Sequence, residues 1–219
     1  MQEFTWSPDA DPSGQKSVFD PYEQARSTDA KIVAILERLT QCFRSLAWES
    51  ARKFHLSPLQ VQFLIYLYYH PEERCRVSHL ARVFQLTQAT VSDAISTLER
   101  KHLIRRTRST QDHRVLTLTL TPAGRTVAER LSHWIAPVRA QVARFSETEK
   151  AFLCGLLLRL VDTLYRAGVI TVDRMCITCR FFRRGGAFPG GAPYYCALLE
   201  QPLQEADVRL DCPEHVPAS

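Results

Sequence analysis

One stretch of this chain, a capped helix followed by a basic hairpin, limits its fold more than any other. Residues 87–102, TQATVSDAISTLERKH, start at the N-cap residue Thr87. Residues 103–107 and 115–120 have the composition of two strands, and the tip between them is rich in arginine. The helix buries one stripe and leaves small polar residues on its outer side. The buried stripe consists of Val91, Ala94, Ile95 and Leu98. This order predicts a helix-turn-helix with a β-wing.

The rest of the first 170 residues reads as helix. Apolar residues recur at intervals of three and four from Asp29 to about Phe54. Ser57, Pro58 and Gln60 open a second, almost wholly apolar helix, and a short helix is expected with Ser78 as its N-cap. Later helices are expected over residues 121–145, kinked at Pro137, and over residues 146–168. The expected fold class is mainly α with a small β-wing (α+β).

The charge of the chain suits a polyanionic partner. The net charge is +5, and residues 76–114 hold eight Lys and Arg against three Asp and Glu. We see no apolar run long enough for a membrane span and no secretory signal, so we expect a cytoplasmic protein without a membrane partner. No Ser/His/Asp set, Gly-rich phosphate loop or carboxylate pair indicates an enzyme.

Residues 80–131 resemble the core of the MarR family of transcriptional regulators. The similar features are L-A-x-x-x-x-L-x-x-x-T-V-S, L-x-x-K-x-L-I-x-R, a D-x-R wing tip and L-T-x-x-G, and the likeness extends over roughly Thr28 to Ile170. The resemblance implies a homodimer, joined through its N- and C-terminal helices, on a near-palindromic operator in double-stranded DNA. It also implies a pocket for a small-molecule effector.

By the same resemblance, one helix and the wing contact DNA. The wing residue Arg114 would enter the minor groove and Asp112 would hold it. The basic hairpin adds Arg105, Arg106 and Arg108. The residues expected at the major groove are Gln88, Ala89, Thr90, Ser92 and Asp93. Two positions depart from the family pattern. Asp93 places a carboxylate toward DNA, where it repels phosphate but can accept from cytosine, and His102 replaces a helix-ending glycine.

Four of the seven cysteines crowd into the last 44 residues. They are Cys176, Cys179, Cys196 and Cys212. In a cytosolic protein this density suits tetrahedral Zn²⁺ or an iron–sulfur cluster. The alternatives are unligated thiols or two disulfides, which a reducing compartment disfavours. His215, three residues after the last cysteine, is a candidate substitute ligand.

The cysteine spacing also resembles that of high-potential iron–sulfur proteins. The similar features are CxxC-x-F, a Tyr before the third Cys, C-x-L after it, and a fourth Cys about fifteen residues on. The resemblance implies a four-iron (4Fe-4S) cluster in an aromatic shell. The residues available for that shell are Phe181, Phe182, Tyr194 and Tyr195. Zinc remains the alternative cofactor.

The sequence therefore predicts three parts: a flexible arm over residues 1–28, a MarR-like winged-helix and dimerisation domain over 29–170, and a small irregular metal-binding lobe over 171–219. We expect a DNA-binding regulator whose lobe senses redox state, oxygen, nitric oxide or metal supply. One alternative is the same regulator with a purely structural zinc lobe. Another is an electron-transfer protein on a winged-helix scaffold, which would not need the arginine hairpin.

Overall fold

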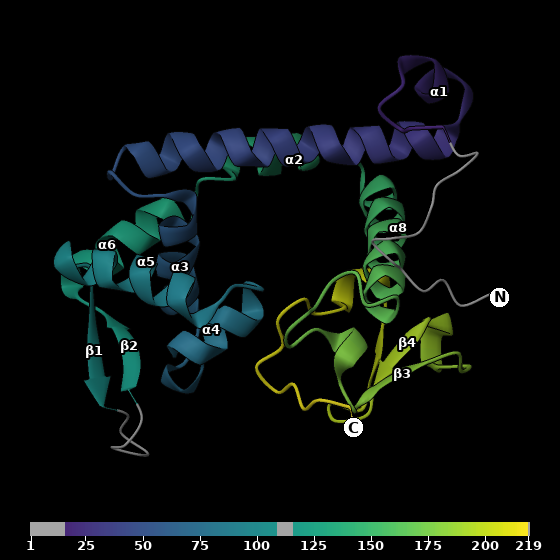
Figure 1. The fold of residues 1–219 in the computed structure, drawn as a ribbon. Helices are drawn as coiled ribbons and strands as arrows, with labels where there is room; N and C mark the ends of the chain where they lie inside the picture. Colours follow the sequence, from purple (N-terminus) through teal and green to yellow (C-terminus); the bar gives the residue numbers. More distant parts are fainter. Residues whose placement is uncertain (1–15, 109–115, 219) are drawn as a thin grey trace. The chain divides into compact units, whose positions relative to one another are not determined.

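The computed structural model describes residues 16–108 and 116–218. The chain divides into two compact units, and within the described ranges the boundary falls between Ala140 and Gln141. The first unit holds the helices and the hairpin anticipated for DNA binding. The second holds a long helix and the cysteine-rich lobe. Figure 1 shows the elements of both units, coloured along the chain.

The first unit begins with three helices that lead into a helix-turn-helix. α1 (Pro21–Arg26) and α2 (Thr28–Arg52) come first, and Ser27 caps α2 by accepting from the Ala30 N–H. α3 (Pro58–Tyr69) begins with the predicted capping box of Ser57 and Gln60. After a 3₁₀ turn at Glu72–Arg74, α4 (Val77–Val83) and α5 (Gln88–Arg100) form the helix pair. α4 starts at Val77 and its N-cap is Arg76, so the predicted cap at Ser78 is wrong.

α3 lies at the centre of this unit, as its almost wholly apolar sequence predicts. Phe63 and Leu64 are fully buried, and α3 packs on α2, on α5 and on α6 (Pro122–Leu131). Three of the four predicted stripe residues of α5, Val91, Ile95 and Leu98, are also fully buried. Burial of such side chains is worth about 1.5–3 kcal/mol each. The core therefore fixes which face of α5 is left for other contacts.

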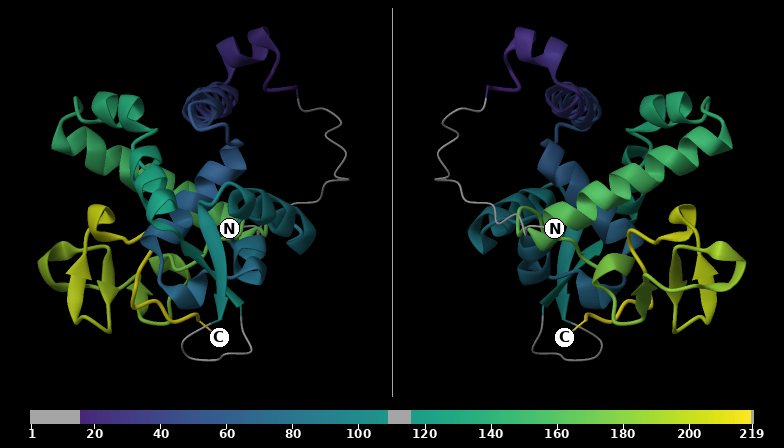
Figure 2. Two further views of the ribbon diagram at one scale, coloured as in Figure 1. Left: turned by 90° about the vertical axis from the view of Figure 1, so that its left-hand side faces the viewer. Right: turned by 90° about the vertical axis from the view of Figure 1, so that its right-hand side faces the viewer.

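The wing is a two-stranded antiparallel hairpin that projects from the helices of its unit (Figure 2). β1 (Ile104–Arg108) pairs with β2 (Leu116–Leu120) in the register Ile104↔Leu120. The Leu118 N–H donates to the Cys75 carbonyl at 2.7 Å, so β2 is also tied to the turn before α4. Thr117 is fully buried and its hydroxyl donates to Glu72 Oε1 at 3.1 Å. These bonds fix the base of the wing.

The long helix predicted for residues 121–145 is wrong, because the chain forms two helices there. α6 ends at Leu131 and α7 (Ala136–Val142) starts five residues later. Pro137 lacks an N–H and its ring clashes with the preceding turn of a continuous helix. In the first turn of α7 a missing N–H costs no hydrogen bond and no preceding turn of the helix exists for the ring to meet, so the proline is tolerated where this helix begins.

The second unit joins α8 (Glu147–Arg166) to the cysteine-rich lobe. α8 opens with the predicted capping box of Ser146 and Glu149, and Gly168 beyond its end has φ of 71°. The lobe holds a three-stranded antiparallel sheet in the order β3 (Phe182–Arg184), β4 (Tyr194–Cys196), β5 (Gln201–Leu203). Its apolar cluster includes Leu158 of α8 together with Met175, Cys176 and Val208. The lobe is therefore packed directly on α8.

The sheet of the lobe is a feature that the sequence did not predict. Each strand has only three residues, too few for an alternating pattern to stand out from a loop. In the described ranges, no helix combines the length and the apolar character needed to cross a membrane.

Candidate functional site

A tight turn joins the two helices of the helix-turn-helix. Gln85 takes φ of 53°, and the Leu86 N–H donates to the Ala81 carbonyl at 2.8 Å, which closes α4. Thr87 then caps α5, because its hydroxyl accepts from the Thr90 N–H at 3.1 Å. The cap predicted from the sequence is confirmed, and it fixes where α5 begins.

The start of α5 presents an exposed polar surface. Gln88, Ala89, Thr90 and Asp93 are exposed and Ser92 is half-buried. The hydroxyls of Thr87 and Thr90 lie 2.9 Å apart, so Thr90 is partly held within the cap. An exposed polar face at a helix N-terminus is the part of a recognition helix that reaches base edges.

Two residues of the L-T-x-x-G motif, Thr121 and Gly124, contact the segment that follows α5. His102 has φ of 55°, as expected for a residue that replaces a helix-ending glycine. Its carbonyl accepts from the Thr121 hydroxyl at 2.7 Å. A Cβ on Gly124 would meet the Leu103 carbonyl oxygen at 1.8 Å, so only glycine allows α6 to approach this closely. α5, the wing and α6 are thereby locked together.

The arginines of the wing have different surroundings. Arg106 reaches back to α5, where Nη1 contacts Glu99 Oε2 at 2.7 Å and Nη2 donates to the Ser96 hydroxyl at 3.2 Å. Arg105 donates to Thr119, and both Arg105 and Arg108 are exposed. Arg106 therefore braces the wing against α5. The tip residues Asp112 and Arg114 lie outside the described ranges.

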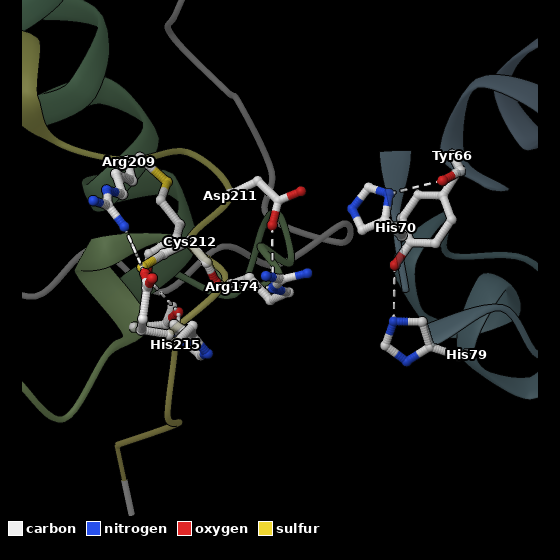
Figure 3. Close-up of polar contacts among 11 residues, drawn as sticks. Tyr66, His70, His79, Arg174, Arg209, Asp211, Cys212 and His215 are labelled. Atoms are coloured by element: carbon white, nitrogen blue, oxygen red, sulfur yellow. Dashed lines mark hydrogen bonds and ion pairs between the residues drawn. The ribbon is translucent and has the colours of Figure 1, made fainter. Parts of the chain in front are cut away.

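A polar network joins α3 to α4. The Tyr66 hydroxyl lies 3.0 Å from His79 Nε2, and His79 Nδ1 lies 3.0 Å from an Arg82 nitrogen. His70 stacks on the Tyr66 ring at 3.7 Å between centroids (Figure 3). Since Arg82 can only donate, His79 accepts at Nδ1 and donates from Nε2 to Tyr66. The network fixes the first helix of the pair against the core.

A cavity of about 320 Å³ lies in the same unit. Its wall mixes aromatic rings with charged side chains, and includes Trp134, Lys53, Arg130 and Glu49. Arg130 also stacks over the Phe54 ring at 5.1 Å. A concave site with aromatic walls and a few charges can hold a small organic molecule.

The structure brings the four cysteines of the lobe together. All four line one small cavity whose other walls are mostly apolar. Cys176 opens a 3₁₀ turn and Cys179 follows its end, where the Cys179 N–H donates to the Cys176 carbonyl at 2.9 Å. Cys196 lies on β4 opposite Phe182 of β3. The remaining wall residues are Phe181, Phe182, Leu198, Leu199 and Glu214.

Arg209 connects two of these sulfurs. Its backbone N–H donates to Cys176 Sγ at 3.3 Å, and its Nη1 donates to Cys212 Sγ at 3.6 Å (Figure 3). The same guanidinium contacts Glu214 Oε2 at 2.6 Å, and that oxygen also accepts from the Cys212 thiol at 3.3 Å. Thiolates are better acceptors than thiols, so the two Arg209 donors favour the charged form of the sulfurs they contact.

The surroundings of two of these thiols disfavour their charged form. Burial raises the pKa of Cys176, and the other three sulfurs raise it further. Burial also raises the pKa of Cys212, with the hydrogen bond to Glu214 adding to the shift. Thiolates gathered this closely repel one another, so a bound cation would reverse the effect.

A buried arginine fixes the loop that carries Cys212. Arg174 is only 6% exposed, and its Nε bonds Asp211 Oδ1 at 3.1 Å and the Cys212 carbonyl at 2.9 Å (Figure 3). The Cys212 N–H in turn donates to the Arg174 carbonyl at 2.8 Å. The last cysteine is thereby bound to the segment just before the first.

The arrangement bears on what the cysteines can bind. In the part of the chain that the structure describes, no group of three or more Cys, His, Asp or Glu side chains is placed to hold a single metal ion. The four sulfurs instead surround a shared space. His215 bonds the Thr178 hydroxyl at 2.9 Å and does not line the cavity.

Sequence reasoning missed three functional candidates in this unit: Arg209, Glu214 and Asp162. Arg209 and Glu214 contact the cysteine sulfurs, and Arg184 of β3 pairs with Asp162 of α8 at 2.5 Å. An isolated charged residue in an irregular segment carries no pattern, so its partner emerges only from the fold. The position of Glu214, two residues after a cysteine, was the only available signal.

Comparison with known proteins bears on the first unit. Residues 56–115 match the MarR family. The MarR match covers α3, the helix pair and β1, a little over a quarter of the chain. The resemblance seen in the sequence is therefore supported for this part. The match ends before the four cysteines of the lobe, and nothing in the comparisons supports the likeness to high-potential iron–sulfur proteins. A search of curated proteins gave no significant match.

Solved structures of a MarR-family protein have a similar fold. S. aureus MepR in its DNA-binding conformation is 25% identical, with a TM-score of 0.53, and the match covers 61% of this chain and 98% of MepR. The S. aureus MepR–DNA complex is 26% identical, with a TM-score of 0.51, and covers 60% and 96%. Both support a mainly helical, MarR-type winged-helix architecture with a small β-wing.

Proposed function

We propose that this protein is a DNA-binding transcriptional regulator. The observation that carries the proposal is the exposed polar start of α5 beside an arginine-bearing wing, held in one unit by Arg106 and Gly124. α5 would read base edges in the major groove, and the wing would contact phosphates or the minor groove. The similarity to MepR, one of whose structures is a DNA complex, supports the same reading.

We further propose that it binds DNA as a homodimer. α2 carries a row of exposed apolar side chains, Ile32, Ile35, Leu39 and Phe43, spaced along one face of the helix. α8 exposes a second set, which consists of Phe152, Leu153, Leu156, Leu157 and Leu160. Exposed apolar rows of this length are typical of surfaces covered by a partner. Two copies would meet two half-sites of a near-palindromic operator.

The DNA-binding proposal is tested with a matched pair of charge substitutions. Arg105→Ala removes an exposed wing arginine, and Lys150→Ala removes one positive charge from α8 in the other unit. Arg105→Ala is expected to weaken DNA binding and to lower the slope of log affinity against log salt by about 1, while Lys150→Ala changes neither. Equal effects of the two variants in fluorescence anisotropy would show that binding follows net charge and not the wing.

The 320 Å³ cavity of the first unit is the candidate site for a small-molecule effector. Its combination of Trp134 with Lys53 and Arg130 suits an aromatic or acidic compound. Binding there would shift DNA affinity only if the compound prefers one conformation of the dimer.

The lobe is proposed as a second regulatory input, sensitive to metal or redox conditions. The supporting observation is that Cys176 belongs both to the cysteine cavity and to the apolar cluster that includes Leu158 of α8. Loss of a bound metal group would loosen this packing where it meets α8. The alternative is a lobe with a purely structural zinc ion. An electron-transfer role is not favoured, because an electron carrier would not need the arginines of the wing.

DNA affinity of metal-loaded protein, compared with that of the same preparation after chelation, separates these readings. A sensor changes its affinity at least several-fold on metal loss while α-helical circular dichroism stays constant. A structural lobe leaves the affinity unchanged or loses helix content in parallel with it.

A further inference from the structure

We propose that the hairpin of residues 180–196, which contains β3 and β4, is a second basic wing that contacts DNA phosphates. The proposal rests on the DNA-binding function proposed above and adds a contact surface in the second unit. Three observations carry it: the charge of the segment, the two faces of the β3–β4 pair, and two arginines that have no carboxylate partner.

The segment that contains the hairpin carries positive charge only. Residues 174–199 hold four arginines and no Asp or Glu. The remaining residues of the lobe, 171–173 and 200–219, hold one arginine and six Asp and Glu. The lobe as a whole is therefore not basic, and its positive charge is concentrated in one segment. Such a separation of charge suits a polyanionic partner at the hairpin.

The two faces of the β3–β4 pair have different surroundings (Figure 1). Phe182 lies opposite Cys196 in the register, and both line the cysteine cavity. Arg183 lies opposite Tyr195, so these two side chains share a face. Because neighbouring residues of a strand point to opposite faces, the face of Arg183 and Tyr195 is turned away from the cavity. Arg183 is exposed there, and Tyr195 is half-buried.

Two of the four arginines are used within the unit, and two are not. Arg174 is buried, and Arg184 pairs with Asp162. Arg180 and Arg183 are exposed, and in the described part of the chain neither contacts a carboxylate. Arg183 Nη1 instead donates to the Arg180 carbonyl at 2.5 Å, which holds the two residues together. Guanidinium groups without a carboxylate partner are available to bind phosphate, and each can do so through two N–H groups.

Aromatic packing gives the hairpin a defined shape. Phe188, in the loop between the strands, stacks on Tyr195 with 5.4 Å between ring centroids and 16° between ring planes. A Cβ on Gly186 would lie 2.8 Å from the Phe188 ring, so glycine lets this ring fold back onto the loop. Arg180 stacks over Phe181 at 5.5 Å. A hairpin that is already ordered loses little conformational entropy when its arginines bind.

Duplex DNA is the partner that this surface fits. The β1–β2 wing also presents exposed arginines, Arg105 and Arg108, from a two-stranded hairpin, so the same chemistry occurs once in each unit. Contacts to phosphates carry no sequence information, and they make affinity depend on salt. The second wing would therefore add affinity for DNA without changing which sequence is preferred.

The test measures binding of the full chain to a long random-sequence duplex by fluorescence anisotropy at several salt concentrations. The double variant Arg180→Ala, Arg183→Ala should lower the slope of log affinity against log salt by about 2 for each bound chain, since each lost phosphate contact lowers it by about 1. The double variant Arg144→Ala, Lys150→Ala removes two positive charges elsewhere in the same unit. It should leave the slope unchanged.

A charge-conserving variant separates binding from folding. Arg180→Lys, Arg183→Lys keeps both charges and should keep the slope, because lysine also binds phosphate as a point charge. Equal losses in the Lys and Ala variants would show that the arginines only shape the lobe, and would overturn the proposal. A slope in the Arg180→Ala, Arg183→Ala variant equal to that of Arg144→Ala, Lys150→Ala would also overturn it, and would leave an acidic protein as the partner. If the unaltered protein binds no duplex, the proposed DNA-binding function itself fails.

Discussion

Arg184 of β3 donates to Asp162 of α8 at 2.5 Å, which joins the cysteine lobe to the helix on which it packs. The Asp162 side chain is only 19% exposed, and the same oxygen also accepts from Arg166. Arg184 stacks over the Phe182 ring at 5.3 Å, and Phe182 is a wall of the cysteine cavity. A change at the cysteines therefore has a short path of contacts to α8.

Asp162→Asn should weaken this link. The substitution removes the charge that holds Arg184, so the lobe is expected to open more often while α8 itself stays helical. Hydrogen exchange at β3 should rise several-fold, which a loss of about 1 kcal/mol produces. Arg166→Ala removes the other partner of the same oxygen, from within α8, and serves as the control. Equal hydrogen exchange at β3 in both variants would show that the Arg184 contact does not hold the lobe on α8.

Gly124→Ala should destabilise the first unit strongly. The added Cβ would overlap the Leu103 carbonyl, which is backbone and cannot swing aside, so we expect a loss of at least about 2 kcal/mol in urea unfolding. Gly155→Ala is the matched change, because its Cβ meets only the flexible Glu205 side chain at 3.1 Å. That variant should be near neutral, since alanine favours a helix by about 0.5–1 kcal/mol. Similar losses in both variants would contradict the close approach of α6.

Arg106 and Glu99 should be energetically coupled. Their ion pair is about one-third exposed on each side, so a double-mutant cycle with Arg106→Ala and Glu99→Ala should give about 0.5–1 kcal/mol. Increasing salt should reduce this coupling. A coupling of zero would mean that Arg106 is free for DNA and does not brace the wing.

Cys75 should resist alkylation while Cys42 reacts. Burial, and then the charges of Glu72 and Glu73, raise the pKa of Cys75 to about 11, so little thiolate forms at pH 8. Cys42 on α2 is exposed in a single chain. Mass spectrometry after brief treatment of the native protein with iodoacetamide measures both. Rapid labelling of Cys75 would contradict its burial, and protection of Cys42 would point to α2 being covered in the dimer.

Local chemistry in the sequence predicted much of the first unit. The caps at Ser57, Thr87 and Ser146 and the positive φ at His102 follow from side chains that bond the nearest backbone. The break between α6 and α7 did not follow, because a proline can kink a helix or start one and only packing decides. The partners of Arg106 and Arg184 lie 7 and 22 residues away, so no local pattern reveals them.

The same reasoning explains why the cysteine site was half predicted. Four cysteines in one short segment indicate a shared ligand, and the fold does bring them to one cavity. The spacing alone left zinc and an iron–sulfur cluster open. The apolar wall and the Arg209 donors depend on β3, β4 and the loop before Cys212, so no local pattern in the sequence reveals them.

Selection of binding sites from a random duplex library tests the central claim, that the protein is a sequence-specific dimeric regulator, most directly. The full chain should enrich a near-palindromic sequence whose half-sites are about one helical turn, 10–10.5 base pairs, apart. Gln88→Ala, at the exposed start of α5, should relax one position in each half-site at a cost of about 1–3 kcal/mol. The account would be contradicted if the protein enriched no sequence. It would also be contradicted if Gln88→Ala enriched the same sequence as strongly as the unaltered protein.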